Sequence, residues 1–192
     1  MLFSQARSQF NRMIPLIHIK RKKTKVSQLS SELEKIAVEI NRVKLPNGFS
    51  QFLHYVFAEL FANISEHSFA VKADVNLSIK DHHNFIEISD SGIGLKKSYI
   101  RKKIFPKDDF AAVDFALNGL STKNFKERGF GLYSIRKLVA ALNRKMTLHS
   151  GNAQVSIQKK KVVQQTTRKI KRGLSIIIDT RVKKIDFYKF IG

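Results

Sequence analysis

The sequence predicts an α+β fold, a two-layer α/β sandwich in which a mixed, mainly antiparallel sheet is covered on one face by helices. Three observations support this fold class. Two helical patterns of apolar residues come first, two alternating strand patterns joined by a hairpin turn follow, and a third helix precedes three further strand patterns. The length of 192 residues suits one domain with room for a short appendage.

The composition excludes several classes of protein. The chain has no cysteine, which excludes a disulfide scaffold, a cysteine nucleophile, a thiolate zinc site and an iron–sulfur cluster. A hydrophobic content of 43% argues against a disordered chain. No apolar run approaches the roughly 20 residues that cross a bilayer, and the apolar stretch at residues 13–19 lacks a cleavage pattern. We expect a cytoplasmic protein without a membrane span.

The charge is strongly positive. The chain has 36 lysines and arginines against 15 acidic residues, a net charge of +21. Such a surface attracts polyanions, whether nucleic acid, an anionic membrane or an acidic partner protein. The alternative is that these lysines are simply solvated surface positions, and the composition does not separate the two. The six histidines show no spacing typical of metal ligands.

Residues 1–45 are predicted to form a basic arm and a helix. Residues 1–23 are interpreted as an arm or an extra helix that ends in a basic run. From Ser27 onward, apolar residues recur every three or four positions, which predicts a helix that stops before the Pro-Asn-Gly turn at 46–48. We expect this segment to dock on the rest of the chain or to mediate association, a homodimer included.

The next helix, residues 50–67, is apolar around most of its circumference and is therefore expected to be buried. Glu59 and Asn63 lie four residues apart and so share one face of this helix. An amide oxygen can bind a hard cation, and a carboxylate can orient or deprotonate a water molecule. A capped or solvated Glu-Asn pair is the alternative.

Two strands, residues 71–79 and 84–89, are predicted to form a hairpin that leads into the sequence Asp-Ser-Gly-Ile-Gly at 90–94. A carboxylate fixed at a strand end, here Asp90, can accept a hydrogen bond from an exocyclic amine, and the glycines allow a ligand to approach the backbone closely. A simple Asp-Ser-Gly turn would have the same sequence.

Residues 96–128 show no dominant period and are expected to form a long, mobile, partly helical connection. The Gly-Phe-Gly-Leu sequence at 129–132 then opens a helix whose N-terminal amides could hold phosphate, although a plain loop-to-helix junction looks the same. Strands are predicted at residues 145–150, 153–158 and 174–180. For the basic stretch 159–172 a solvated hairpin loop is favoured over nucleic-acid contact, because no aromatic residue interleaves with the cations.

The order of these motifs resembles the ATP-binding domain of the GHKL superfamily, which is shared by DNA gyrase, the heat-shock chaperone, sensor histidine kinases, anti-sigma-factor kinases and mismatch-repair MutL. Residues 59–68 look like its N box, 90–95 like its first glycine box and 128–132 like its second. The resemblance covers about residues 46–180. It implies a histidine-kinase-like ATPase fold for residues 46–192, with an ATP lid at about 96–128.

The resemblance also implies cofactors, ATP and Mg²⁺, and roles for individual residues. Asp90 would receive the adenine amino group, Asn63 would hold the magnesium ion, and Glu59 falls where hydrolysing members keep a water-activating carboxylate. Gly92 and Gly94 would line the base and ribose. The residues implied to meet the phosphates are Ser121, Thr122 and Lys123 in the lid, and Gly129, Gly131 and Leu132 at the following helix.

The chain departs from the pattern at two positions. Glu127 stands where the second glycine box often has another glycine, and Leu174-Ser175 follows Gly173 where relatives often have Gly-Thr. Fewer than 50 residues precede the domain, so autophosphorylation in cis is not expected, and the chain ends too soon for a transducer domain. The layout most resembles stand-alone modules such as anti-sigma-factor serine kinases.

The sequence therefore favours a Mg-ATP-binding regulatory module that acts on a protein partner as a slow ATPase or as a serine/threonine protein kinase. One alternative is a non-catalytic, ATP-sensing adaptor that binds nucleic acid or an acidic partner through its basic surface. The other is a relative of the same fold that binds no nucleotide.

Overall fold

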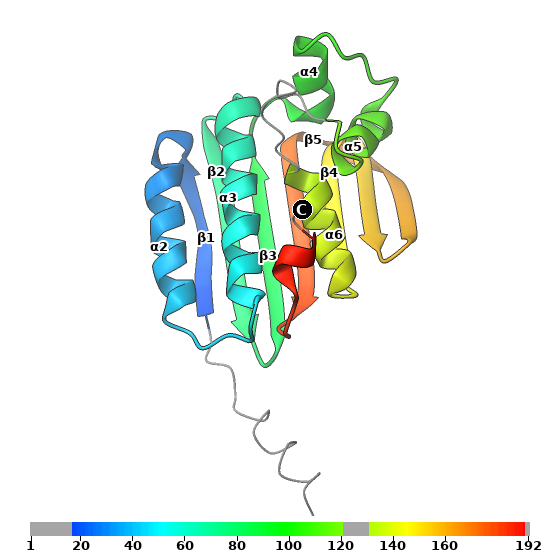
Figure 1. Ribbon diagram of the computed structural model, residues 1–192. Coiled ribbons are helices and arrows are strands. Elements are labelled where there is room, and N and C mark those ends of the chain that lie inside the picture. The colour runs from blue at the N-terminus through cyan, green and yellow to red at the C-terminus, as the bar shows by residue number, and fades with distance from the viewer. Residues whose placement is uncertain (1–16, 121–130, 191–192) are drawn as a thin grey trace, which may run out of the picture.

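The computed structural model describes residues 17–120 and 131–190. Figure 1 shows the predicted sandwich, in which α2, α3 and α6 cover one face of a five-stranded sheet of order β1-β2-β3-β5-β4. All four strand pairs in the described residues are antiparallel, so the predicted α+β class is confirmed with a sheet that has no parallel pair there. The elements are β1 (Ile17–Lys25), η2 (Val26–Gln28), α2 (Leu29–Asn41), α3 (Phe49–His67), β2 (Lys72–Lys80), β3 (His83–Asp90), α4 (Gly94–Arg101), α5 (Asp109–Leu117), α6 (Gly131–Ala141), β4 (Lys145–Gln158), β5 (Lys161–Arg181) and η3 (Phe187–Phe190).

The core lies between the sheet and its helices. The alternating sequence of β2 turns its apolar side chains toward the helices, where Leu77 and Ile79 are fully buried. Phe52 and Phe57 of α3 are also fully buried, as the apolar circumference of that helix predicts. This packing fixes α3 over the centre of the sheet, and α3 carries two of the predicted site residues.

The interpretation of residues 1–23 as an arm or an extra helix was wrong over its described part, which starts at residue 17. Residues 17–25 form the edge strand β1, which pairs antiparallel with β2 from Ile17 opposite Ile79 to Lys25 opposite Lys72. A register shift between Ile19 and Lys22 interrupts the pairing. The basic run hides the alternation that usually marks a strand, but lysines are common on edge strands because they discourage pairing with other chains.

The two C-terminal strands, β4 and β5, pair with each other in two separate stretches. Residues 145–150 of β4 pair with 174–179 of β5, whereas residues 153–158 pair with 161–166. The hydroxyl groups of Thr147 and Ser156, nine residues apart on β4, are only 2.9 Å from each other, so β4 bends back on itself between them. The loop predicted at 159–172 is thus mostly strand, with a turn only at residues 159–160. Valine, threonine and glutamine in this stretch suit an exposed strand, and residues 161–166 are indeed exposed.

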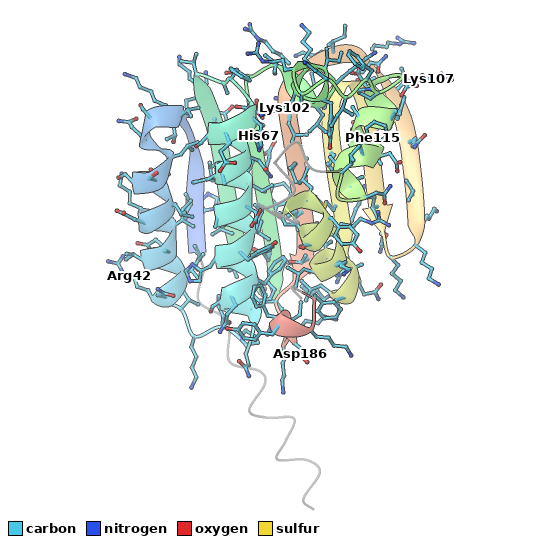
Figure 2. The ribbon with its side chains drawn as sticks, turned by 45° about the horizontal axis from the view of Figure 1, so that its top comes forward. Arg42, His67, Lys102, Lys107, Phe115 and Asp186 are labelled. Atoms are coloured by element: carbon cyan, nitrogen blue, oxygen red, sulfur yellow. The ribbon has the colours of Figure 1, made fainter. Side chains whose placement is uncertain are left out.

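The predicted connection at 96–128 is partly helical over its described part, as expected, with α4 and α5 joined by an irregular segment at residues 102–108. Asp108 caps α5 by accepting a hydrogen bond from the Ala111 amide at 2.8 Å. The Asp109 carboxylate accepts a second bond from the Asn152 amide of β4 at 3.0 Å. Figure 2 places Lys102 and Lys107 of this region at the same end of the molecule as His67. The remainder of the predicted lid, residues 121–128, lies outside the described residues.

Candidate functional site

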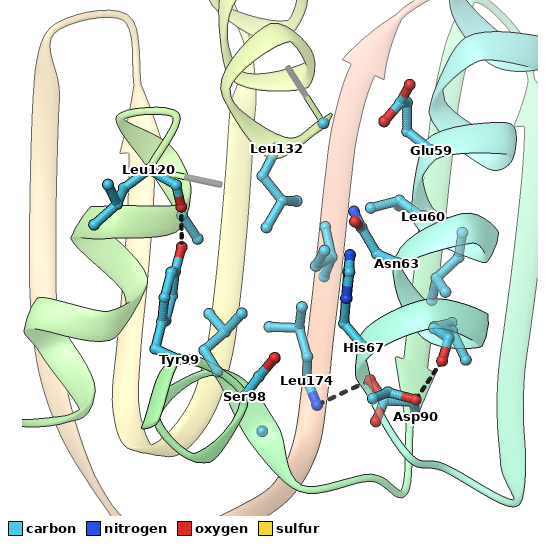
Figure 3. Close-up of a pocket in the computed structure, with 18 of the residues that line it drawn as sticks. Glu59, Leu60, Asn63, His67, Asp90, Ser98, Tyr99, Leu120, Leu132 and Leu174 are labelled. Carbon is cyan, nitrogen blue, oxygen red and sulfur yellow. Dashed lines mark hydrogen bonds between the residues drawn. The ribbon is translucent and has the colours of Figure 1, made fainter. Parts of the chain in front are cut away.

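An open cavity lies between α3, α6 and the α4–α5 region, and the sheet forms its floor. It encloses about 930 Å³ of empty space, counting the part open to solvent. Figure 3 shows Glu59, Asn63 and His67 along one wall and Leu132 on the facing helix. The structure therefore gathers side chains of the predicted N box around one cavity.

Asp90 is held at the end of β3 by two main-chain amides. Its Oδ1 atom accepts a hydrogen bond from the Gly92 amide at 2.7 Å, and its Oδ2 atom accepts one from the Leu174 amide of β5 at 3.1 Å. The second contact depends on Gly173, where a Cβ atom would lie 2.3 Å from the Asp90 carbonyl oxygen. Two amide donors and a close glycine fix the carboxylate as an oriented acceptor in the cavity wall.

The electrostatic environment of Asp90 opposes its ionisation. The residue is only 6% exposed, and this burial raises the pKa of its carboxyl group above the ordinary value. The amides of Gly92 and Leu174 and the nearby charge of Lys171 act in the opposite direction and lower that pKa. A ligand that offers a hydrogen-bond donor to Asp90 would further favour the ionised form.

The two glycines that follow Asp90 have different places. Gly92 is not part of the cavity wall; a Cβ atom there would lie 1.9 Å from the Ser68 carbonyl oxygen, so the glycine lets the turn pack on the end of α3. The next amide, that of Ile93, donates to the same oxygen at 2.8 Å. Gly94 does line the cavity, with a φ angle of +78° that favours glycine, and it begins α4.

Glu59 and Asn63 meet the start of α6. The position of a Cβ atom on Gly131 would be 3.5 Å from Glu59 Oε2 and 3.6 Å from Asn63 Nδ2. The first amides of a helix have no partner within that helix and attract anions. A carboxylate, a side-chain amide and a helix N-terminus thus lie together, which is the combination that the sequence motifs predict separately.

Glu59 also affects a neighbour on its own helix. The pKa of the Tyr55 hydroxyl is raised by burial first and by the charge of Glu59 in addition, while a hydrogen bond with the Ser134 side chain of α6 lowers it. This hydrogen bond joins α3 to α6.

His67 and Tyr99 are cavity residues that the sequence interpretation did not include. His67 follows Asn63 by four residues on α3, and its Nε2 atom is 3.4 Å from the Glu66 carboxylate. The spacing of Glu59, Asn63 and His67 places all three on one helix face and could have indicated it. The Tyr99 hydroxyl donates to the Leu120 carbonyl at 2.6 Å, and burial raises its pKa, so it stays protonated (Figure 3).

The remaining predicted contacts divide into two groups. Leu132 lines the cavity and is 8% exposed. Four predicted phosphate ligands, Ser121, Thr122, Lys123 and Gly129, lie outside the described residues.

Two further observations concern clusters of metal-ligating side chains and membrane-spanning helices. In residues 17–120 and 131–190, no three His, Asp or Glu side chains gather as they would around a metal ion. Within the same residues, no helix is long and apolar enough to cross a membrane.

Comparison with known proteins agrees with the geometry. Among curated proteins, none matches the chain significantly. The sequence pattern of the family described as histidine kinase-, DNA gyrase B- and HSP90-like ATPases matches residues 48–180, which include α3, the Asp90 turn and α6. The chain therefore belongs to this ATPase family, and residues 48–180 are its ATP-binding domain.

Proposed function

We propose that the chain is a Mg-ATP-dependent regulatory module that acts on a partner protein, either as a slow ATPase or as a serine/threonine protein kinase. The observation that carries the proposal is the meeting of Glu59, Asn63 and the start of α6 at Gly131. Asp90 lines the same cavity, and Figure 3 shows the space between it and Glu59. A nucleotide would have its base at Asp90 and its phosphates at α6.

The base end of the cavity suits adenine. The oriented Asp90 carboxylate can accept a hydrogen bond from an exocyclic amino group, such as the one that adenine carries. Leu174 and Ile176 of β5 provide apolar surface beside it for a planar ring. A base with a carbonyl oxygen at that position would place two acceptors against each other.

The phosphate end suits a magnesium triphosphate. Asn63 offers a side-chain oxygen, and Mg²⁺ in phosphate sites is usually held by one or two protein ligands together with phosphate oxygens. The N-terminal amides of α6 could donate hydrogen bonds to phosphate oxygens, with the helix dipole adding to the attraction. The residues present therefore fit a metal that arrives with the nucleotide and supplies charge neutralisation for phosphoryl transfer.

Glu59 would carry out the proton chemistry. In an ATPase its carboxylate would orient and deprotonate a water molecule, and in a protein kinase it would accept the proton of a substrate hydroxyl. Both reactions need the same side chain at the same place beside the terminal phosphate. The structure supports this role through the proximity of Glu59 to Gly131.

The proposal is tested by adding ATP and magnesium to the full chain while recording its melting temperature, phosphate release and phosphate transfer to serine and threonine peptides. At about 100 times the Kd, ATP should stabilise the protein by about 2.7 kcal/mol, which corresponds to a rise of roughly 5–10 °C. Asp90→Asn and Asn63→Ala should lose most of this rise. Glu59→Gln should keep the rise but lose turnover.

The matched control is Glu34→Gln, which removes one carboxylate from an exposed position on α2. It should bind ATP and turn it over as the wild type does. The absence of any ATP-induced rise in the wild type would refute the nucleotide site. A normal rise without phosphate release or transfer would refute the catalytic part and favour an ATP-sensing adaptor.

A further inference from the structure

A second, basic cavity lies beside the nucleotide site. We call it the basic groove and define it by five cations that line it: Lys23, Lys72, Lys169, Lys171 and Arg172. They come from β1, β2 and β5, three strands that the sequence order keeps far apart. The groove encloses about 1090 Å³ of empty space, counting the part open to solvent. Asp90 lines both this groove and the nucleotide cavity.

The basic groove has a large excess of positive charge. Only two carboxylates, those of Asp74 and Asp90, line it together with the five cations. The Asp90 carboxylate is already bonded to two main-chain amides. Lys171 donates to the Asp90 carbonyl oxygen, with Nζ 3.4 Å away, so one cation is held at the boundary between the two cavities. An anion in the groove would therefore meet cations that their own surroundings do not neutralise.

The cations are placed by ordered structure. The pairing of β4 with β5 shifts register between Gly151 and Ala153, opposite residues 166–171, and Thr167 lies in this part of β5. Its Oγ1 atom is 3.0 Å from His149 Nε2 of β4 and 3.0 Å from the Lys169 carbonyl oxygen. These contacts fix the backbone directly before the three basic residues, which distinguishes the groove from a solvated loop.

We propose that the basic groove binds an acidic segment of the partner protein that carries an apolar side chain among its carboxylates. The charge requires an anionic ligand, and Ile170, which is 73% exposed between two lysines, offers an apolar contact. Single-stranded nucleic acid usually stacks its bases on aromatic rings, and no phenylalanine or tyrosine lines the groove in the described residues. The groove therefore suits an acidic peptide better than a nucleic acid.

This inference deepens the proposed function, because the bound segment would belong to the regulated partner. The shared residue Asp90 places that segment next to the nucleotide. Binding of the acidic segment itself needs no ATP and can be measured in its absence. Failure of the groove and failure of the nucleotide site can thus be told apart.

The test measures fluorescence anisotropy of a labelled short peptide of glutamate, aspartate and serine with a central leucine, titrated with the full chain at physiological salt. The groove variant is Lys169→Gln/Lys171→Gln/Arg172→Gln. Because the variant removes three charges that would face the peptide, it should bind the peptide about tenfold or more weakly. A peptide with glycine in place of leucine should also bind the wild type more weakly.

The matched control is Lys183→Gln/Lys184→Gln/Lys189→Gln, which removes three exposed cations from another short segment. That segment lies around Asp186, at the end of the molecule opposite His67 in Figure 2. The control should bind the peptide within about twofold of the wild type. Equal losses in both variants would show attraction by net charge alone and would overturn the proposal.

A second probe separates the two kinds of polyanion. A single-stranded oligonucleotide with the same number of negative charges should bind more weakly than the peptide and should not distinguish the two variants. Tighter oligonucleotide binding that is lost only in the groove variant would overturn the proposal in favour of a nucleic-acid site. The melting temperatures of both variants check that they fold. If the groove variant does not fold, Ile170→Ser, a substitution at an exposed position, still tests the apolar contact by itself.

Discussion

The orientation of the Asp90 side chain depends on a neighbouring amide and on a second amide far away in the sequence. Its place after a predicted strand and before two glycines was enough to select it as a site residue. The amide that holds its second oxygen belongs to Leu174, 84 residues away, and comes close only because β3 pairs with β5. The spacing of neighbouring residues can be read from the sequence, but the register in which two distant strands pair cannot. The same limit explains why the need for glycine at position 173 was not predicted.

The raised pKa of Asp90 leads to a test at the residue scale. Because burial makes the folded state hold this proton more tightly than the unfolded chain does, ionising Asp90 costs stability. The free energy of unfolding of the wild type, minus that of Asp90→Asn, should therefore fall as pH rises from the ordinary carboxyl value of about 3.9 to the raised folded value. Above that pKa the difference should be constant.

Urea unfolding of the two proteins from about pH 4 to about pH 8 measures this difference. Subtracting the variant removes the contributions of the other titrating groups. A difference that rises with pH would show that the amides of Gly92 and Leu174, with Lys171, outweigh burial and lower the folded pKa instead.

At the scale of elements, hydrophobic periodicity predicted well wherever one face of an element is buried. The α3 helix, Phe49–His67, and the β2–β3 hairpin agree with their sequence patterns because core contacts dictate where their apolar residues stand. The β1 strand and residues 161–172 of β5 were missed for the opposite reason. Both lie at exposed positions where basic and polar residues are tolerated, so pairing with a neighbour, which the sequence does not display, decides their structure.

The contact between α5 and β4 gives a test at this scale. Gly151 has a φ angle of +61°, and a Cβ atom there would lie 2.0 Å from Asp109 Oδ2. Gly151→Ala should therefore displace the Asp109 carboxylate and break its bond from the Asn152 amide, which together with backbone strain at this positive φ should cost about 2 kcal/mol. Hydrogen exchange followed by mass spectrometry should show faster exchange in α5, with α3 still protected.

A second variant distinguishes the collision from the backbone strain. Asp109→Ala/Gly151→Ala removes the carboxylate that obstructs the new methyl group, so its loss of stability should be smaller than the sum of the two single losses. If α5 exchanged as slowly in Gly151→Ala as in the wild type, the anchoring role assigned to this contact would be wrong.

At the scale of the whole molecule, the family pattern begins at residue 48 but the sheet begins at residue 17. Residues 17–41 contribute the edge strand β1 and the helix α2, whose Ile36 and Ile40 are 1% and 0% exposed in the common core. His54 Nε2 of α3 lies 3.0 Å from Asn41 Oδ1 at the end of α2. The sequence indicated a basic arm and a helix that would dock on the rest of the chain or mediate association. The packing of residues 17–41 agrees with docking and makes these elements part of one sandwich.

We therefore predict that a chain beginning at residue 46 cannot keep the native core. Its loss of β1 would leave the edge of β2 unpaired, and its loss of α2 would expose apolar surface of α3. Size-exclusion chromatography and thermal melting should show aggregation or a broad transition at low temperature, in contrast to the full chain. A monomeric fragment that melts sharply near the full-length temperature would instead support an independent domain from residue 46.

The turn at residues 159–160 connects two strand segments that pair with each other, and both of its lysines are exposed. Exposed turns of this kind tolerate substitution because few contacts depend on them. Since the chain has no cysteine, a single Lys160→Cys substitution would create its sole thiol. A dye attached to this exposed thiol would report the tumbling and self-association of the protein, so no labelled ligand would be needed.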